Sequence, residues 1–256
     1  LPLIKACKER GVRTVAFPVA LPAYGTSLTV RRKKEYFKGK HYPGLMRKHP
    51  GQYRIDQGSG EPVSYYAAHI IPELAAAGIL PSNPWVLGAN LCNSVILAGE
   101  NERDLLLEDG AEPERLIVTG LRAHDRLHEL FSKKAELRGS LSAKYGLPPG
   151  KLMIAALPQS AEEGILTWER HWQEIRFVCQ ILKDMDAPTL ISLHPRMKRE
   201  HYEFVQTEYG LTIVEERLAD ILPAGDIFSS SFSSTVQWAV LCGIPSIIWT
   251  CFGVDY

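Results

Sequence analysis

The sequence alternates short, β-branched apolar runs with longer amphipathic stretches, and this alternation limits the fold more than any other feature. Eight runs have the length and composition of strands: 12–19, 93–99, 115–120, 151–158, 189–195, 211–216, 226–231 and 245–250. Helical patterns lie between them at 101–110, 124–145, 168–185, 198–209 and 234–242. Several strands are apolar on both faces, as expected where helices cover both sides of a parallel sheet. The pattern predicts an α/β protein made of βα units.

A Pro/Gly turn after the helical pattern 124–145 indicates a domain boundary within 121–150. Residues 1–140 are then an amino-terminal Rossmann-like domain, and residues 151–256 form most of a second one. The segment 20–92 is rich in turn-forming residues and is predicted to be an irregular insertion with short helical pieces. The chain starts without an initiator Met, so we expect a piece of a longer protein, partial at both ends, whose two sheets face a cleft.

Composition argues against several classes of partner. Lys+Arg and Asp+Glu both number 29 in the 256 residues, so no overall field attracts nucleic acid. No stretch approaches the roughly 20 apolar residues of a membrane span. The five cysteines are scattered, without a CxxC or Cys/His cluster, which is typical of a cytoplasmic protein without a zinc site or disulfides. The basic run 30–40 is interpreted as a solvated helix face, with peripheral contact at the inner face of the membrane as the alternative.

The stretch "SSSFSST" at 229–235 places six hydroxyl side chains in seven positions, where a strand ends and an apolar helix begins. One Ser or Thr is enough to cap that helix. The free N–H groups and the dipole at a helix start also favour an anion. Because Ser233, Ser234 and Thr235 exceed what a cap needs, phosphate binding is the second hypothesis for this segment.

His194 strengthens the phosphate hypothesis. It ends an apolar strand, and Pro195 disfavours a helical continuation. The imidazole is therefore expected in a strand-end loop, where it can donate to a phosphate or protonate a leaving group. Arg196 after the same strand and Arg217 after the next are candidate supplementary cations, with solvent-facing roles as the alternative; Glu216 is a further candidate cleft residue.

Two stretches carry a resemblance to a known family. "LISLHPR" and "ERLADILPAGDIFSSSFSSTVQWAVLCGIPSIIW" resemble the donor-nucleotide half of GT-B glycosyltransferases. They are most similar to bacterial sialyltransferases and polysialyltransferases, capsule sugar transferases and CDP-glycerol glycerophosphotransferases. The His-Pro motif that holds the donor phosphate in those families falls on His194-Pro195, and the Ser-Ser/Thr motif on Ser233–Thr235. "AEPERLIVTGLRAHDRL" resembles the last strand of the first GT-B domain, so the resemblance covers roughly 95–256.

The resemblance implies a cytoplasmic glycosyltransferase of polysaccharide or capsule biosynthesis. It would move a sugar, or a polyol phosphate, from a nucleotide-activated donor, CMP- or UDP-linked, to a glycan or lipid-linked acceptor, alongside other glycan-assembly proteins. It implies no cofactor and no metal. Two alternatives stay open: an epimerase or hydrolase like the UDP-N-acetylglucosamine 2-epimerases, and a non-catalytic glycan-binding protein. The epimerases place Ser-Gly-Gly and paired Glu where this chain has Ser-Ser-Thr followed by Val236-Gln237-Trp238, which argues against that activity.

The catalytic base is less well defined. In the sialyltransferase group a carboxylate of an acidic-acidic-Gly motif in the first domain deprotonates the acceptor. The local match, Glu108-Asp109-Gly110, is interpreted instead as a helix end with a glycine cap. Asp56, Glu61 and Asp125 are the alternatives, together with residues preceding this chain.

Two further groups are candidates for the cleft. Arg122 and His124 follow "VTG", where either can reach a donor or an acceptor. His124 and His128 also have the i, i+4 spacing of metal ligands, but no third ligand is evident and a surface helix is favoured. Backbone groups of residues 215–218 are expected to meet the base or ribose of the donor.

Overall fold

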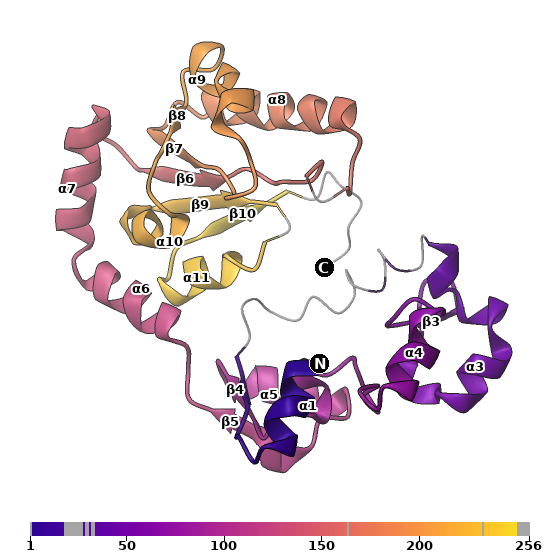
Figure 1. The fold of residues 1–256 in the computed structure, drawn as a ribbon. Coiled ribbons are helices and arrows are strands. Elements are labelled where there is room, and N and C mark those ends of the chain that lie inside the picture. Colours follow the sequence, from indigo (N-terminus) through magenta and orange to yellow (C-terminus); the bar gives the residue numbers. More distant parts are fainter. Residues whose placement is uncertain are drawn as a thin grey trace. The chain divides into compact units, whose positions relative to one another are not determined.

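The structure is a computed structural model that describes residues 2–17, 28, 31, 34–162, 164–231 and 233–249. The chain forms two compact units, residues 1–121 and 122–256 (Figure 1). All eight predicted strands are present in the described residues, each shorter than its apolar run. The predicted α/β class with parallel sheets is confirmed. No described helix has the length and apolarity that crossing a membrane requires.

The second unit contains a sheet of five parallel strands. They are β6 (Met153–Ala156), β7 (Thr189–Ser192), β8 (Thr212–Ile213), β9 (Ile227–Ser230) and β10 (Ser246–Ile248). Their order in the sheet is β10-β9-β6-β7-β8, so the chain builds outward from β6 on one side and then crosses to the other. The direction of winding therefore reverses between β6 and β9. In open α/β sheets, ligands bind beyond the carboxyl ends of the strands at such a switch point.

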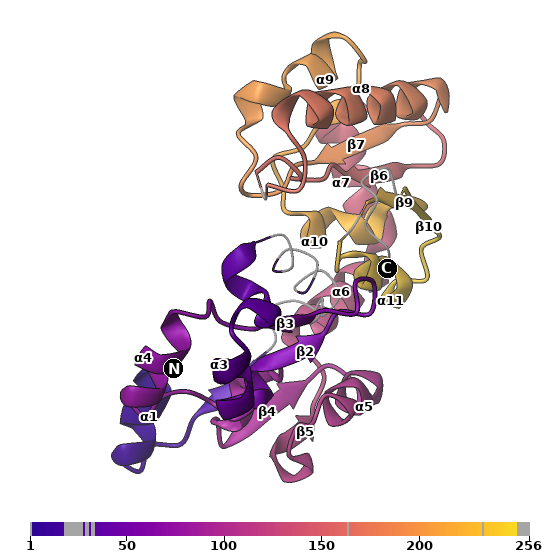
Figure 2. The same ribbon diagram turned by 90° about the vertical axis from the view of Figure 1, so that its right-hand side faces the viewer.

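Helices cover both faces of this sheet. On one face lie α8 (Trp168–Asp184), the 3-10 helix η6 (Arg199–Tyr202) and α9 (Phe204–Thr207) (Figures 1 and 2). On the other lie α6 (Arg122–Ser132), α7 (Lys134–Tyr145), α10 (Leu218–Ile221) with the 3-10 turn η7 (Leu222–Ala224), and α11 (Val236–Leu241). Ile154 packs in the second layer and Ala155 in the first, both fully buried. Burial on both faces explains why β6 is continuously apolar.

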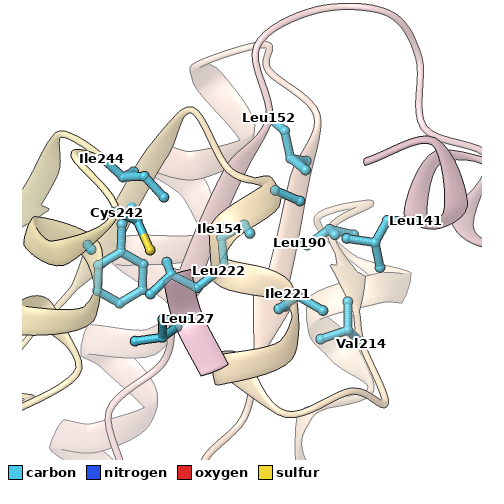
Figure 3. Close-up of a cluster of buried hydrophobic side chains, with 13 residues drawn as sticks. Leu127, Leu141, Leu152, Ile154, Leu190, Val214, Ile221, Leu222, Cys242 and Ile244 are labelled. Atoms are coloured by element: carbon cyan, nitrogen blue, oxygen red, sulfur yellow. The ribbon is translucent and has the colours of Figure 1, made fainter. Parts of the chain in front are cut away.

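The predicted helix 124–145 is two helices, separated at Lys133, whose φ of −108° and ψ of 24° are not helical. Leu127 of α6 and Leu141 of α7 belong to the same buried cluster as Ile154 and Leu190 (Figure 3). One straight helix of this length would extend about 35 Å, well beyond the roughly 20 Å width of five strands. The break lets both leucines reach one core. These helices therefore belong to the second unit, and the predicted end of the first domain moves from 140 to 121.

Asp226 lies where the strands of the five-stranded sheet begin, at the side of the sheet called here the amino edge. Its Oδ2 accepts from the Leu152 backbone N–H at 2.9 Å and pairs with Arg138 of α7. Its Oδ1 accepts from Lys134 Nζ at 3.1 Å. Burial alone would raise the pKa of Asp226, but the Leu152 N–H and the two cations outweigh it and hold the pKa at about 2.

The first unit has a smaller parallel sheet of order β1-β4-β5. Its elements are α1 (Pro2–Glu9), β1 (Val15–Ala16), β4 (Ser94–Leu97), α5 (Glu100–Glu108) and β5 (Leu116–Val118). Val95, Leu97 and Leu106 are buried together between the sheet and α5.

The predicted insertion 20–92 is described from 34 onward, together with Leu28 and Arg31, so part of the basic run 30–40 lies outside the described residues. Its helical pieces are α3 (Pro43–Lys48), α4 (Ile70–Ala76) and 3-10 turns at Glu35–Phe37, Gly39–His41, Pro50–Gln52 and Leu87–Asn90; another 3-10 turn, Pro113–Arg115, precedes β5. An antiparallel hairpin of β2 (Tyr53–Ile55) and β3 (Pro62–Ser64) was not predicted, because three-residue strands leave almost no periodic signal.

Candidate functional site

Three loops leave the carboxyl edge of the second sheet beside its switch point. They are residues 157–166 after β6, residues 193–198 after β7 and residues 231–235 after β9. Ala156 pairs with both Ser192 and Ser230, so the three loops begin at the same level of the sheet. Because β7 and β9 flank β6, the ends of those two strands are roughly 9–10 Å apart. The predicted His194 and hydroxyl motifs thus follow the two strands on either side of β6.

The hydroxyl segment forms a local turn ahead of α11. Ser233 Oγ accepts from the Thr235 backbone N–H at 3.2 Å and shares a hydrogen bond of 2.7 Å with Thr235 Oγ1. This geometry closes the first turn before α11. Ser234 is exposed beside it. The predicted side-chain cap is not formed, because the N-cap residue Thr235 makes no side-chain hydrogen bond to the first turn of α11.

Ser231 is a residue that the sequence analysis counted only as part of a strand. It follows β9 directly and is 2% exposed. Among the described residues its Oγ has no hydrogen-bond partner. A buried hydroxyl without a partner costs stability, and such groups concentrate where a structure serves something other than stability. No sequence signal separates Ser231 from its hydrogen-bonded neighbours.

His194 is half-buried in the turn after β7. Its backbone oxygen accepts from the Met197 N–H at 2.8 Å, which closes the turn, and its Nδ1 accepts from the Arg196 backbone N–H at 3.2 Å. A ring nitrogen that accepts carries no proton, so the neutral imidazole holds its proton on Nε2. The contact favours this neutral, donating form, since an imidazolium would place two N–H groups against each other. Of the two predicted roles, donation to a ligand fits this geometry better than proton transfer.

Of the candidate cations, Arg196 lies in the His194 turn and Arg217 precedes α10, and both are exposed. Arg122 and His124 lie in the first turn of α6 rather than on the three loops. The structure thus brings Arg196 to the candidate site but places the two α6 residues on a different element.

Glu216 has a structural role that the sequence did not indicate. Its carboxylate accepts from Lys144 Nζ at 2.7 Å and from Tyr145 Oη at 2.5 Å, both at the end of α7. Burial opposes ionisation, but these two donors outweigh it and lower the pKa of Glu216 to about 2. The Tyr145 hydroxyl also accepts from the Glu215 backbone N–H at 3.1 Å. Both groups thus fasten the segment after β8 to α7, and the cleft role of Glu216 and base recognition by this backbone stay predictions.

The acidic-acidic-Gly match is a helix end, as the sequence analysis preferred. Asp109 follows α5 and accepts from Arg54 Nη1 at 2.7 Å, and its backbone oxygen accepts from Asn83 Nδ2 at 2.8 Å. Gly110 has a φ of 86°, the left-handed conformation of a C-terminal cap. Asp109 links the β2–β3 hairpin to α5.

The alternative bases of the first unit also have structural partners. Asp56 is 5% exposed, and its Oδ2 accepts from the Ser59 N–H at 2.9 Å and the Ser59 hydroxyl at 2.6 Å, which closes the hairpin turn. Glu61 pairs with Lys40 at 2.5 Å. Asp125 is exposed on α6, in the second unit. These partners explain Asp56 and Glu61 without a catalytic role.

Within the described ranges, no three His, Cys, Asp or Glu side chains are grouped closely enough to hold a metal ion, and His124 with His128 is no exception. Cys7, Cys92, Cys179 and Cys242 are free thiols, and Cys251 lies outside the described residues.

No protein-family model matches the sequence, and no curated protein matches it significantly. Among solved structures, this chain has distant counterparts. The UDP-GlcNAc 2-epimerase of Methanocaldococcus jannaschii, in complex with UDP-GlcNAc and UDP, is 16% identical with a TM-score of 0.48, over 62% of this chain and 46% of that one. A CDPG-soaked variant of the wall teichoic acid polymerase TagF is 13% identical with a TM-score of 0.43, over 62% and 38%.

Anabaena Alr3699/HepE, in complex with UDP and glucose, is also 13% identical, with a TM-score of 0.33 over 61% of this chain and 44% of that one. This chain thus spans less than half the length of these three proteins. At such identities the likeness concerns the fold alone.

Proposed function

We propose that this chain is part of a GT-B-type glycosyltransferase that moves a sugar, or a polyol phosphate, from a nucleotide-activated donor to a glycan acceptor. One observation carries the proposal: the loops with His194 and with Ser233–Thr235 follow the strands on either side of β6, at the switch point of a parallel sheet. The resemblance of the His-Pro and Ser-Ser/Thr motifs to those of GT-B enzymes supports it.

In this proposal the donor phosphate lies between the two loops. His194 Nε2–H donates from one side, and the hydroxyls of Ser233, Ser234 and Thr235 donate from the other. Ser231, whose hydroxyl has no partner among the described residues, adds a donor after a small shift.

These groups would act by electrostatic stabilisation. When the bond to the nucleotide breaks, negative charge accumulates on the leaving phosphate, and donors already aimed at that position stabilise it without reorganising. Arg196, exposed in the His194 turn, adds positive charge near it. No metal is invoked. Three parts of the proposal rest on the resemblance. The donor is CMP- or UDP-linked, the acceptor is a glycan or is lipid-linked, and the protein associates peripherally with the membrane or with other glycan-assembly proteins.

The test is nucleotide binding by the full-length protein. CMP, CDP, UDP, GDP and their sugars are compared by thermal shift, and the best ligand is then titrated calorimetrically. Replacing Ser233 and Ser234 together by Ala should weaken its binding by about 1–3 kcal/mol, because hydrogen bonds to a charged group are lost. Ser132→Ala is a matched control, since that hydroxyl donates only to the Glu129 backbone oxygen on α6.

Three other results would contradict the proposal. If the double variant loses only about 1 kcal/mol of stability and keeps its affinity, the hydroxyls serve the turn before α11 alone. Release of a free epimer without an acceptor would indicate an epimerase on the same fold. Nucleotide binding without turnover in the presence of acceptors would indicate a binding protein.

A further inference from the structure

Four polar side chains that no motif singled out form a continuous buried chain of hydrogen bonds beside the switch point. Ser160 Oγ lies 2.9 Å from His171 Nδ1, and His171 Nε2 lies 2.8 Å from Tyr202 Oη. Tyr202 Oη in turn donates to Glu162 Oε1 at 2.9 Å. Ser160, His171 and Tyr202 are fully buried, each with 0% exposure.

The donor and acceptor of each hydrogen bond in this series follow from the bond between Tyr202 and Glu162. The Tyr202 hydroxyl has a single proton and gives it to Glu162, so it must accept from His171 Nε2–H. In a neutral ring Nδ1 then carries no proton and accepts from the Ser160 hydroxyl. Burial lowers the pKa of His171, opposed by the negative charge of Glu162, and so favours the neutral ring that this arrangement needs. A neutral histidine and an ionised glutamate satisfy all three contacts at once.

These hydrogen bonds connect the loop after β6 to η6, the 3-10 helix that follows the His194 loop. Ser160 and Glu162 lie in the loop after β6, whereas Tyr202 ends η6, eight residues after His194. The turn that carries His194 is closed by Met197, which is 7% exposed and packs in the same core cluster as Tyr202. His171, in the first turn of α8, joins the two sides.

Stability alone does not account for this arrangement. Glu162 Oε2 is buried and, among the described residues, has no hydrogen-bond partner. Burying an incompletely solvated carboxylate costs stability, and an apolar core of the same shape is often at least as stable as a buried polar group. The surrounding rings of Trp172 and Phe204 already supply apolar packing around Tyr202. Hydrogen bonds depend on direction, so they hold the two segments in one geometry where apolar contacts would allow several.

We propose that Ser160, Glu162, His171 and Tyr202 are positioning residues that hold the loop after β6 in fixed register with the His194 turn, so that both present their groups to one phosphate-bearing ligand. The inference rests on the proposed function, in that the ligand is the phosphate of a nucleotide donor. Tyr202 is the central member, since among the described residues its hydroxyl alone links His171 to Glu162.

The experiment compares three variants of the full-length protein. Tyr202→Phe removes the hydroxyl that links His171 to Glu162 and keeps the aromatic ring. Glu162→Gln keeps an acceptor for the Tyr202 hydroxyl and is the conservative rescue. Asp226→Asn is the distant control, because it weakens a polar cluster at the opposite edge of the same sheet. Each is measured for melting temperature, for affinity towards CMP, CDP, UDP and GDP by calorimetric titration below that temperature, and for amide hydrogen exchange without ligand.

We expect Tyr202→Phe to weaken nucleotide binding about tenfold, the usual scale of one lost buried hydrogen bond, and to speed exchange in peptides covering 157–162 and 193–198. Glu162→Gln should stay within about twofold of wild type, and Asp226→Asn should lower the melting temperature without changing affinity. Wild-type affinity and exchange in folded Tyr202→Phe would overturn the inference.

The two proposals fail separately. If the wild-type protein binds none of the four nucleotides, the proposed function is lost. Hydrogen exchange then decides the positioning role on its own: coupled loosening of the two loops in Tyr202→Phe supports it, and loosening confined to one loop or to neither refutes it.

Discussion

At the amino edge of the five-stranded sheet, both oxygens of Asp226 are occupied by a backbone N–H and two cations, whereas at the carboxyl edge the buried Ser231 hydroxyl has no partner among the described residues. The two groups flank the same strand, β9, at its beginning and at its end. A fold selected for stability alone would satisfy both ends alike, because each orphan group costs stability. The difference supports the proposal that the carboxyl edge serves a ligand, whereas the amino edge holds the unit together.

The largest expected effect is at the carboxyl edge. His194→Ala should reduce turnover on the order of 100-fold while leaving the melting temperature close to wild type. His194→Gln should recover more turnover than His194→Asn, because its longer amide reaches the position of Nε2–H, whereas asparagine reproduces only the Nδ1 acceptor. Steady-state kinetics per folded molecule, with nucleotide sugar and acceptor, measure this. The opposite ranking would show that the contact with Arg196 matters more than donation.

Removing the charge at the amino edge should affect folding and not turnover. Asp226→Asn is expected to lower the free energy of unfolding by about 2 kcal/mol, in line with a pKa lowered from 3.8 to about 2. Urea denaturation measures the loss. The amide oxygen can still accept from the Leu152 N–H, so the sheet edge stays closed. A change in nucleotide affinity in this variant would mean that the two edges are not independent.

Acid should destabilise the second unit mainly through Asp226 and Glu216. Both carboxyls have pKa values lowered to about 2, from ordinary values of 3.8 and 4.5. Their contribution is therefore fully present above about pH 4.5 and is lost as the pH falls towards 2. The Glu216 part is smaller than its shift suggests, because Lys144 is 46% exposed and solvent screens the pair. Denaturation curves of wild type and Asp226→Asn should converge as the pH is lowered from 5 to 2.

The smallest expected effect is that of Ser231→Ala. Because the hydroxyl has no partner in the described part of the chain, its removal should leave the free energy of unfolding unchanged or raise it by about 0.5–1 kcal/mol. If the hydroxyl turns towards a bound phosphate, nucleotide affinity should fall by up to about tenfold. A clear loss of stability would instead assign Ser231 to the fold and remove the contrast between the two edges.

The sequence by itself determined the elements and their class. Runs such as 151–158 are apolar on both faces only when helices cover both sides, so β6 and its neighbours were predictable. Pro195 after an apolar strand placed His194 in a loop, and the hydroxyl-rich stretch was expected to join the end of a strand to the start of a helix, as it does between β9 and α11. These features depend on residues within one element or one turn, where local sterics and hydrogen bonds decide.

Only the tertiary structure decided what those residues contact. The contacts of Glu216 with Lys144 and Tyr145, some seventy positions earlier, could not be predicted from the sequence. The hydrogen bonds that run from Ser160 to Tyr202 join segments forty residues apart. Helix α7 belongs to the second unit because Leu141 reaches its core. Contacts between distant segments depend on strand order and helix packing, and single-residue patterns do not encode them. For that reason motifs marked the candidate site, while the network that supports it was found only in the fold.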